Sequence, residues 1–412
     1  MTEFRDVDFS EQQNYLKQWH LHRRMIDDKF DVRASVDAEY AWKTLDNFGD
    51  ENIVIAVADD GCNIFHSSLS VENKIVDWVY IQNGSLYSSE MKDSDVKKMF
   101  LPNKFHGSSM CSLIAGGVVD QAPFGVAPNC RLIPIRWEYN SFFSISDEDL
   151  IHVLDYISDK VDIMVNTWVR MPNLIFSDSV LKKIEWLSLN GGRRGKGILF
   201  IWSSNNSSCP VNFESEELIP YKVDIEKDCN GNKYISNVYV SNKFRNSLVN
   251  ISNTIIVSSI NSLAQRSNYS GYGPGISCCA PSNNSHVIGI KDVIGLGLTT
   301  SFGVEGKVTH NFKGTSGATA LAAGVAALIL SANDSLNSIE LKRVLLESAS
   351  KDIDLSYYYD DGISNPNFDP VKPFDTGYFN SEGWSPWFGY GCVNAYRGVK
   401  QALEIKNERK NS

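Results

Sequence analysis

Short, continuously apolar runs recur along the chain, and each is followed by turn residues and then by a stretch long enough for a helix. The runs expected to form strands are residues 52–58, 131–135, 162–165, 197–202 and 254–257. Apolar runs without alternation are typical of parallel strands that are buried on both faces. The intervening stretches 146–160 and 178–189 have helical length. The pattern predicts an α/β fold: a doubly wound, mostly parallel sheet with helices on both faces.

Two segments interrupt this alternation of strands and helices. Residues 206–252 are rich in Asn, Ser, Lys and Glu, and we expect a surface insertion there that contains a hairpin. Residues 351–390 form a second irregular stretch with several Pro. From residue 403 to residue 412 the chain reads as a short polar tail. Residues 46–402 are therefore predicted to form one domain with two insertions.

Composition and charge exclude several classes of protein. The chain has 39 Lys and Arg against 49 Asp and Glu, a net charge of −10, and this balance disfavours nucleic-acid binding. Its 42% of hydrophobic residues excludes disordered and low-complexity classes. The longest apolar run, residues 320–330, is well short of the roughly 18 residues that cross a bilayer. We expect a folded protein that has no membrane span and no nucleic-acid partner.

The N-terminal segment, residues 1–45, contains no apolar stretch of the kind found in secretory signal peptides. The chain's 8 cysteines are too few for a disulfide scaffold and lack zinc-ligand spacing. We expect buried, reduced thiols in a cytoplasmic protein. A Cys209–Cys229 bridge in an oxidising compartment is the alternative, and export by a non-classical route is the corresponding alternative for localisation.

Three strand or helix ends carry side chains suited to chemistry. A buried run ends in Asp59-Asp60-Gly61, a helix of small residues begins at His106, and Ser316 lies at the start of an apolar helix that should be buried on all sides. Each has an ordinary structural interpretation: an Asx turn, a structural histidine and a helix-capping serine. Taken together, Asp59, His106 and Ser316 follow the chain order of the subtilisin triad.

The segments around these residues resemble those of the subtilisin-like serine protease family. The chain reads DDG from residue 59, HGSSMCSLIAG from residue 106 and GTSGATALAAG from residue 314. The family has approximately D-[TSD]-G, H-G-T-H-V-A-G-x-I-A-G and G-T-S-M-A-x-P-x-x-A-G. Further matches are GVAPN from residue 125, NYSGYGP from residue 268 and FGYGCVNA from residue 388. The resemblance covers roughly residues 40–402 and implies a subtilisin-like α/β fold and a peptide or protein substrate.

The resemblance also implies a role for each residue. Ser316 would attack the scissile carbonyl, His106 would act as general base and then acid, and Asp59 would orient the imidazole. The segment FIWSSN, which ends at Asn205, matches the family's strand followed by A-A-G-N. Asn205 would therefore donate to the developing oxyanion beside the backbone N–H of Ser316. A loop asparagine in an Asn/Ser run is the alternative for this residue.

The predicted substrate pocket departs from the family pattern. The doubled Asp59-Asp60 resembles the kexin/furin branch, in which the second Asp faces a basic residue next to the cleavage site. The acids that support basic-residue recognition in that branch are missing after Thr167-Trp168-Val169, so paired-basic cleavage is not expected. Val169 and Ser204, which follows Ser203, stand at two positions where the family has glycines that line the substrate pocket. They predict a narrowed primary pocket that selects a small or unusual residue on the acyl side.

The expected function is a subtilisin-like serine endopeptidase that matures a dedicated peptide or protein precursor. The alternative is a catalytically silent relative that binds a peptide in the same cleft. An α/β-hydrolase is excluded because residues 314–318 lack the G-x-S-x-G elbow. No cofactor is required for the chemistry. The family resemblance implies that structural calcium is common, yet its ligands do not match here, and Asp147-Glu148-Asp149 and Asp360-Asp361 are more simply solvated acidic faces.

Overall fold

The computed structural model describes residues 4–137, 145–231, 233–284, 295–302, 307–356 and 370–411. The acidic pair Asp360-Asp361 lies outside these residues. Short 3₁₀ helices lie at Phe4–Asp6, Val32–Ala34, Val96–Met99 and Ser247–Asn250.

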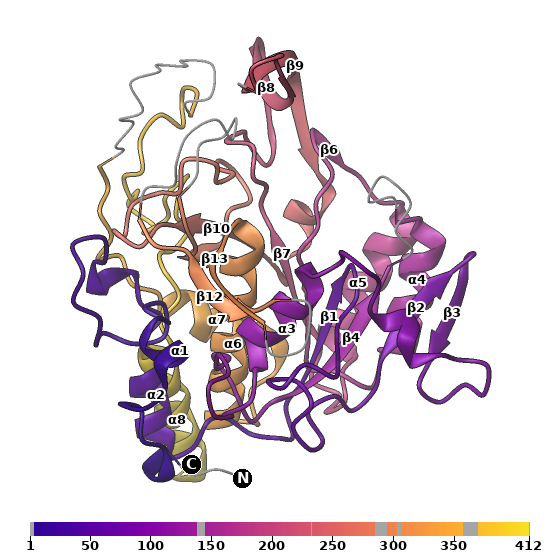
Figure 1. Cartoon of the computed structure of the whole chain (residues 1–412), viewed down its shortest axis with the longest axis vertical. Coiled ribbons are helices and arrows are strands. Elements are labelled where there is room, and N and C mark those ends of the chain that lie inside the picture. The colour runs from indigo at the N-terminus through magenta and orange to yellow at the C-terminus, as the bar shows by residue number, and fades with distance from the viewer. Residues whose placement is uncertain are drawn as a thin grey trace.

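A central sheet, whose described strands have the order β11-β10-β7-β5-β1-β4-β2-β3, organises the molecule (Figure 1). Its strands are β1 (Val54–Asp59), β2 (Val79–Gln82), β3 (Ser85–Ser88), β4 (Arg131–Arg136), β5 (Ile163–Asn166), β7 (Leu199–Ser203), β10 (Thr254–Ile260) and β11 (Cys278–Pro281). Neighbouring strands pair in parallel, except for the antiparallel edge pair β2 and β3. The predicted mostly parallel α/β sheet is confirmed, and each of the five apolar runs forms one of its strands.

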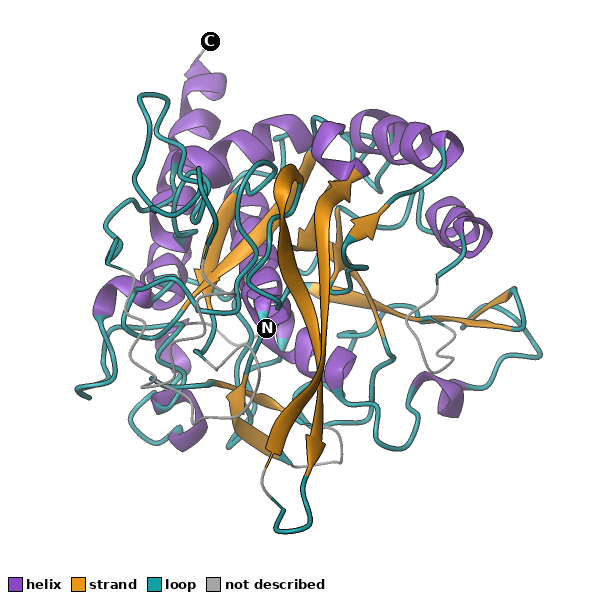
Figure 2. Cartoon of the chain, turned by 90° about the horizontal axis from the view of Figure 1, so that it is seen from above, coloured by secondary structure: helices purple, strands orange, loops and turns teal. Residues whose placement is uncertain are grey.

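Helices cover both faces of the sheet, as Figure 2 shows from above. The first face carries α2 (Ala38–Leu45), α3 (His106–Ala115), α6 (Thr315–Ala332), α7 (Ser338–Glu347) and α8 (Ala395–Asn411). The second carries α4 (Asp147–Tyr156) and α5 (Asp178–Asn190). Strand β1 supplies both cores, because Ile55 and Val57 pack on the first face and Val54, Ala56 and Ala58 on the second. Burial on both faces explains why these runs are apolar without alternation.

Helix α6 is the central helix of the larger core. It packs against α3, α8 and strands of the sheet, and 94% of it is buried. Among the described helices, it alone has the length and composition that could cross a membrane. Its burial inside the protein accounts for the same apolar composition, as the sequence pattern predicted.

The insertion predicted at residues 206–252 contains a hairpin that is much longer than its sequence suggests. Strands β8 (Phe213–Lys227) and β9 (Lys233–Asn246) pair antiparallel, and the short β6 (Asn173–Leu174) adds to β9 in parallel. A second hairpin, β12 (Leu298–Ser301) and β13 (Val308–Phe312), precedes α6. Figure 1 shows the β8–β9 hairpin standing above the rest of the molecule.

The polar residues from 403 onward do not form a separate tail, because α8 continues to Asn411. Their long side chains bind the preceding helices. The Lys406 ammonium donates to the Ala332 carbonyl at 3.2 Å, and the Arg409 guanidinium donates to Ser335 Oγ at 2.9 Å and pairs with Glu340. A charged sequence at this position is therefore the outer face of a packed helix.

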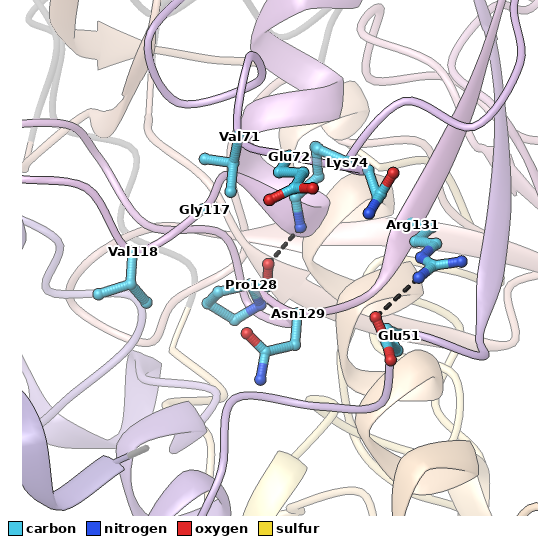
Figure 3. A pocket seen from close by; sticks show the side chains of 10 residues that line it. Glu51, Val71, Glu72, Lys74, Gly117, Val118, Pro128, Asn129 and Arg131 are labelled. Atoms are coloured by element: carbon cyan, nitrogen blue, oxygen red, sulfur yellow. Dashed lines mark hydrogen bonds and ion pairs between the residues drawn. The ribbon is translucent and has the colours of Figure 1, made fainter. Parts of the chain in front are cut away.

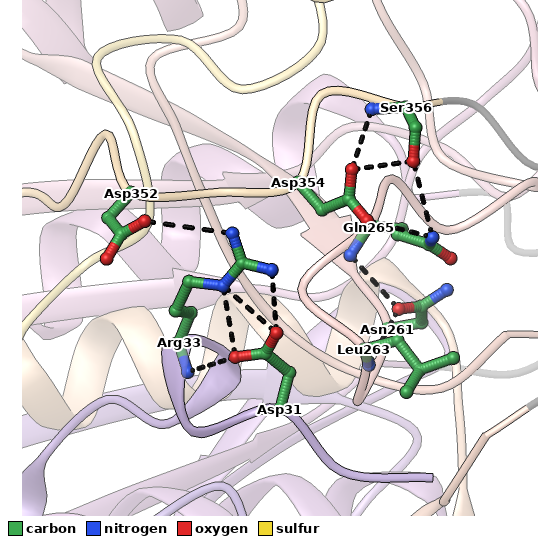
Figure 4. A network of polar contacts seen from close by, with 8 residues as sticks. All are labelled: Asp31, Arg33, Asn261, Leu263, Gln265, Asp352, Asp354 and Ser356. Atoms are coloured by element: carbon green, nitrogen blue, oxygen red, sulfur yellow. Dashed lines mark hydrogen bonds and ion pairs between the residues drawn. The ribbon is translucent and has the colours of Figure 1, made fainter. Parts of the chain in front are cut away.

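The N-terminal segment, which includes α1 (Gln13–Leu16), is tied to loops that come from distant parts of the chain (Figure 4). The Arg33 guanidinium donates to Asp31 at 2.7 Å and lies 3.7 Å from a carboxylate oxygen of Asp352. Close by, the Gln265 amide donates to Asp354 at 3.0 Å. The backbone N–H of Asp31 donates to the Ser262 carbonyl at 2.7 Å, so residues before the first strand of the sheet hold the loop after β10 as well as the loop after α7.

Candidate active site

Two of the predicted site residues meet where β1 ends and α3 begins. Asp59 is the last residue of β1 and is buried, whereas His106 is the first residue of α3 and its side chain is 37% exposed. A Cβ at position 107 would overlap the carbonyl oxygen of Gly61. Gly107 therefore lets the helix approach the turn closely enough for the two side chains to meet.

Asp59 and His106 form a two-point contact. Nδ1 of His106 lies 2.9 and 2.8 Å from the two carboxylate oxygens of Asp59. Although burial opposes the charged imidazolium, the charge and hydrogen bond of Asp59 raise the pKa of His106 to about 9, and Asp60 adds to this. Burial also disfavours the Asp59 carboxylate, but His106, Thr167 and the backbone N–H of Asp60 lower its pKa overall. The carboxylate is thus positioned to stabilise an imidazolium.

Thr167 connects Asp59 with Ser316. Its hydroxyl donates to a carboxylate oxygen of Asp59, and its backbone carbonyl accepts the Ser316 hydroxyl at 3.2 Å. Thr167 follows β5, which pairs with β1, so the parallel sheet brings the two strand ends together. Sequence reasoning placed Thr167 in the substrate pocket and missed this polar role, because only the strand pairing brings its hydroxyl to Asp59.

Ser316 lies in the first turn of α6 and is 5% exposed. The backbone N–H groups of that turn have no acceptors within the helix, and the positive end of the helix dipole favours negative charge there. Gly314, just before the helix, has a φ of +95°, a conformation that favours glycine. Its N–H donates to the Tyr269 hydroxyl at 3.1 Å, and its carbonyl accepts the Ser282 hydroxyl at 2.8 Å. The matched motif at residues 268–274, together with Ser282, therefore holds the turn that presents Ser316.

The side-chain amide of Asn205 is bound at both ends within its own loop. Asn205 is fully buried, its Nδ2 donates to the Cys209 carbonyl at 3.1 Å, and its Oδ1 accepts the backbone N–H of Ser207 at 3.0 Å. Both ends of the amide thus close the loop after β7. The loop alternative describes Asn205 better than the predicted oxyanion role does.

Its neighbour Asn206 faces the start of α6 instead. Oδ1 of Asn206 accepts the backbone N–H of Thr315 at 2.8 Å and its hydroxyl at 3.0 Å. Asn206 is exposed, and a Cβ at Gly314 would lie 3.2 Å from its Nδ2. An exposed amide N–H donor therefore lies beside the turn that carries Ser316. In the sequence, either of the two adjacent asparagines could match the family's oxyanion asparagine. The glycine that precedes this asparagine in the family is missing here, so the motif does not show that Asn206 is the match.

The carboxylate of Asp60 accepts hydrogen bonds from the N-terminus of α3. One carboxylate oxygen accepts the backbone N–H of Gly107 at 2.7 Å and the other that of His106 at 3.4 Å, and the residue is 6% exposed. Burial and the charge of Asp59 raise the pKa of Asp60 to about 7, although His106 and the Gly107 N–H oppose the shift. The resemblance placed Asp60 against a basic substrate residue. That role stays a prediction; in the structure the carboxylate caps the helix that carries His106.

The remaining predicted pocket residues lie at the ends of β5 and β7. Trp168 is packed edge-to-face against Trp137, Phe176 and Trp202 at ring distances of 6.0 to 6.2 Å. Ser203 and Ser204 are buried, and Val169 is half-buried. The two segments that the resemblance assigns to the acyl-side pocket are thus adjacent strand ends, carried by the paired strands β5 and β7.

In the described part of the chain the cysteines form no disulfide. Cys229 is exposed at the tip of the β8–β9 hairpin, and the other cysteines, Cys209 included, are buried and free. The alternative Cys209–Cys229 bridge is therefore not formed. Burial raises the pKa of the Cys209 thiol above its usual range.

No group of three or more His, Cys, Asp or Glu residues in the described ranges could hold a metal ion. Asp147, one of the acidic candidates, begins α4 and accepts the backbone N–H of Ser177 at 2.7 Å. Among the described residues no cluster of His, Cys, Asp or Glu marks a calcium site, and no step of the chemistry is assigned to calcium.

A polar cavity of about 550 Å³ opens at the opposite ends of the sheet's strands, where β4 begins (Figure 3). The Lys74 ammonium donates to the carbonyls of Pro128 and Cys130, and Arg131 pairs with Glu51 at 2.7 Å. Burial lowers the pKa of Lys74 to about 8. The lining includes none of the predicted site residues, and its two cations are already bound to protein groups.

The chain is similar in sequence to proteins that are named as proteases. The chain is 28% identical over 427 residues to the "Calcium-dependent protease" of Nostoc sp., covering 97% of this chain and 53% of the relative. It is 24% identical over 393 residues to "Kexin" of Candida albicans, covering 93% and 34%. The chain thus spans about half the length, or less, of these relatives.

Among solved structures, the serine protease of Aeromonas sobria, in complex with its chaperone, superposes with a TM-score of 0.66 at 18% identity. That match covers 95% of this chain and 66% of the other. It shows a shared fold. The model of the subtilase family of peptidases matches residues 50–391, the whole span that holds Asp59, His106 and Ser316. The chain therefore belongs to the subtilase family of serine proteases.

Proposed function

We propose that the chain hydrolyses peptide bonds with Asp59, His106 and Ser316 as its catalytic triad. The observation that carries the proposal is the contact of His106 with both oxygens of the buried Asp59, which Thr167 links to the hydroxyl of Ser316. Retention of all three groups favours this function over peptide binding without hydrolysis.

The first step is a change in the hydrogen bond of Ser316. Its hydroxyl, which donates to the Thr167 carbonyl, rotates to Nε2 of His106 and gives up its proton as Oγ attacks the scissile carbonyl. Asp59 stabilises the imidazolium that forms. His106 then returns the proton to the leaving amine, and water repeats the cycle to release the acyl product.

The negative oxygen of the tetrahedral intermediate requires donors, and we assign two. One is the backbone N–H of Ser316 in the first turn of α6. The other is Nδ2 of Asn206, whose orientation is supported by the bonds that its Oδ1 accepts from Thr315. Asn205, which was predicted for this role, stabilises the loop instead.

The substrate we propose is a peptide or protein precursor that is cut at few bonds. Support comes from the side chains at Val169 and Ser204, which add volume where the family has glycine. Sequencing of peptides released from a cell lysate tests this part, and we expect cleavage mainly after small residues. Frequent cleavage after large aromatic residues would contradict a narrowed pocket.

A fluorophosphonate probe tests the catalytic assignment directly. Such a probe modifies a serine only when a base and an oxyanion site activate it. We expect labelling of Ser316 in the folded protein, none in Ser316→Ala, and strongly slowed labelling in His106→Ala. Failure to label the folded wild-type protein would favour the catalytically silent alternative.

A further inference from the structure

The two faces of the β8–β9 hairpin differ sharply in chemistry. Paired positions place apolar side chains on one face, with Val223 opposite Val238, Ile225 opposite Ile235, and Val240 opposite Pro220. We call Val223, Ile225, Ile235, Val238 and Val240 the hairpin's apolar face. Ile225, Val238 and Val240 are 38%, 49% and 43% exposed, and the other two are partly buried.

The opposite face is polar, and its charged groups are bound to one another. The Tyr239 hydroxyl donates to Asp224 at 2.7 Å, the Lys222 ammonium lies 4.4 Å above the Tyr239 ring, and the Tyr234 hydroxyl donates to Glu226 at 2.9 Å. A two-stranded ribbon is marginally stable in water by itself. Burial of the apolar face by a partner would therefore stabilise the hairpin, whereas the polar face needs none.

The base of the hairpin joins two chain segments of the proposed active site. Strand β8 follows the loop that holds Asn205 and Asn206, and β9 pairs with β6, which follows the segment beginning at Thr167. A small core of Cys209, Ile219 and Phe244 packs with Met171 and closes this junction. The hairpin thus continues the two segments that the resemblance assigns to the acyl side of a substrate.

We propose that the apolar face of the β8–β9 hairpin binds an extended apolar segment of the polypeptide substrate, on the amino-terminal side of the scissile bond. The proposal rests on the proposed function, and it adds a docking site outside the cleft. From Arg245, which pairs with Asn173 in β6, to Ile235 the strand runs for about 33 Å at roughly 3.3 Å per residue. A substrate therefore needs on the order of ten residues before the cleft to reach the whole face.

The test uses two fluorogenic peptides that share one cleavage sequence found by lysate profiling. One carries a twelve-residue amino-terminal extension of alternating Val and Thr that ends in two Lys for solubility. The other carries a Gly/Ser extension of equal length that also ends in two Lys. We expect kcat/KM to be about tenfold higher for the Val/Thr peptide, mainly through KM, because its extension buries apolar surface on the hairpin.

Variants of the two faces separate docking from structure. The double variant Ile225→Thr with Val238→Thr keeps β-branched side chains and should abolish the preference for the Val/Thr peptide. The matched double variant Lys222→Thr with Asn237→Thr changes the polar face and should retain it. Hydrolysis of the Gly/Ser peptide should be unchanged in both.

Several results would overturn the proposal. One is an equal kcat/KM for the two peptides, and another is a preference that survives the apolar-face variant. If the apolar-face variant lost kcat/KM equally for both peptides, the apolar face would have a purely structural role. A dimer that sedimentation detects, and that the apolar-face variant dissociates without changing the preference, would assign the face to a second copy. Absence of both hydrolysis and Ser316 labelling in the wild type would instead refute the proposed function, and the docking site with it.

Discussion

Asn206 and Thr315 are joined by two hydrogen bonds, one from the backbone N–H of Thr315 at 2.8 Å and one from its hydroxyl at 3.0 Å, and Oδ1 of Asn206 accepts both. The bonds connect the loop after β7 to the start of the helix that carries Ser316. Because the carbonyl end of the amide is held, its N–H end is oriented before a substrate arrives. Such pre-organised donors are the usual means of stabilising an oxyanion.

The two adjacent asparagines should therefore respond differently to truncation. Asn206→Ala is expected to lower kcat by about 10²–10³, the magnitude known for the equivalent donor in subtilisin, with little change in KM. Asn205→Ala is expected to lower the free energy of unfolding by about 1–3 kcal/mol, because it leaves buried partners unsatisfied. Steady-state kinetics and urea unfolding of both variants check this, and a larger kcat loss in Asn205→Ala would restore the role to Asn205.

The sequence allowed the fold to be predicted, and it placed Asp59 at a strand end and His106 and Ser316 at helix starts, where the structure has them, because such ends leave clear local patterns. Asp59 ends a run that is apolar at every position, and Ser316 begins a helix without a polar face. The choice between Asn205 and Asn206 could not be made in the same way. The segment SSNNSS lacks the glycine that would set the register, and only the contact with Thr315 decides it.

Features that depend on neighbouring strands were also missed. The bond from Thr167 to Asp59 exists because β5 lies beside β1, a relation that local sequence does not encode. The capping of α3 by Asp60 likewise depends on how a turn meets a distant helix. The outer turns of α8 have the composition of a polar tail because their charged residues bind the preceding helices through the ends of their long side chains.

Thr167 offers a second test, because its hydroxyl donates to Asp59 while its carbonyl holds Ser316. Thr167→Val removes the hydroxyl and keeps the shape, so Asp59 loses a donor that lowers its pKa. We expect kcat to fall by about tenfold and the unfolding free energy to fall by about 1–2 kcal/mol. Thr167→Ser, which keeps the hydroxyl, should retain most of both, and an equal loss in both variants would point to packing instead.

The cysteines predict a simple labelling pattern. Cys229 is exposed, whereas the thiols near the triad, Cys62 and Cys111, are fully buried. Their contact with each other, together with burial, raises the pKa of the Cys111 thiol well above its usual range, and a thiol without thiolate character reacts slowly. Iodoacetamide should modify Cys229 alone in the native protein and all 8 cysteines after denaturation. Peptide mapping identifies the modified residues, and labelling of Cys111 in the native protein would contradict its burial.

Asp60 should control the pH dependence of stability. Because burial raises its pKa to about 7, the folded state retains a proton that the unfolded state loses near pH 4. Stability from this group is therefore present at low pH and is lost as pH rises toward 7. Asp60→Asn should remove that loss, so urea unfolding at pH 8 should show a gain over the wild type that is absent at pH 4. A loss at both pH values would mean that capping of α3 dominates.

The same substitution should shift the pH profile of catalysis. The charge of Asp60 helps to raise the pKa of His106, which must be neutral to accept the proton of Ser316. Asp60→Asn should therefore move the acid limb of the kcat/KM profile to lower pH, by on the order of one pH unit. Asp95→Asn removes the same charge from an exposed position and serves as the control. An unmoved acid limb in Asp60→Asn, or an equal shift in Asp95→Asn, would show that the Asp60 charge does not act on His106 directly.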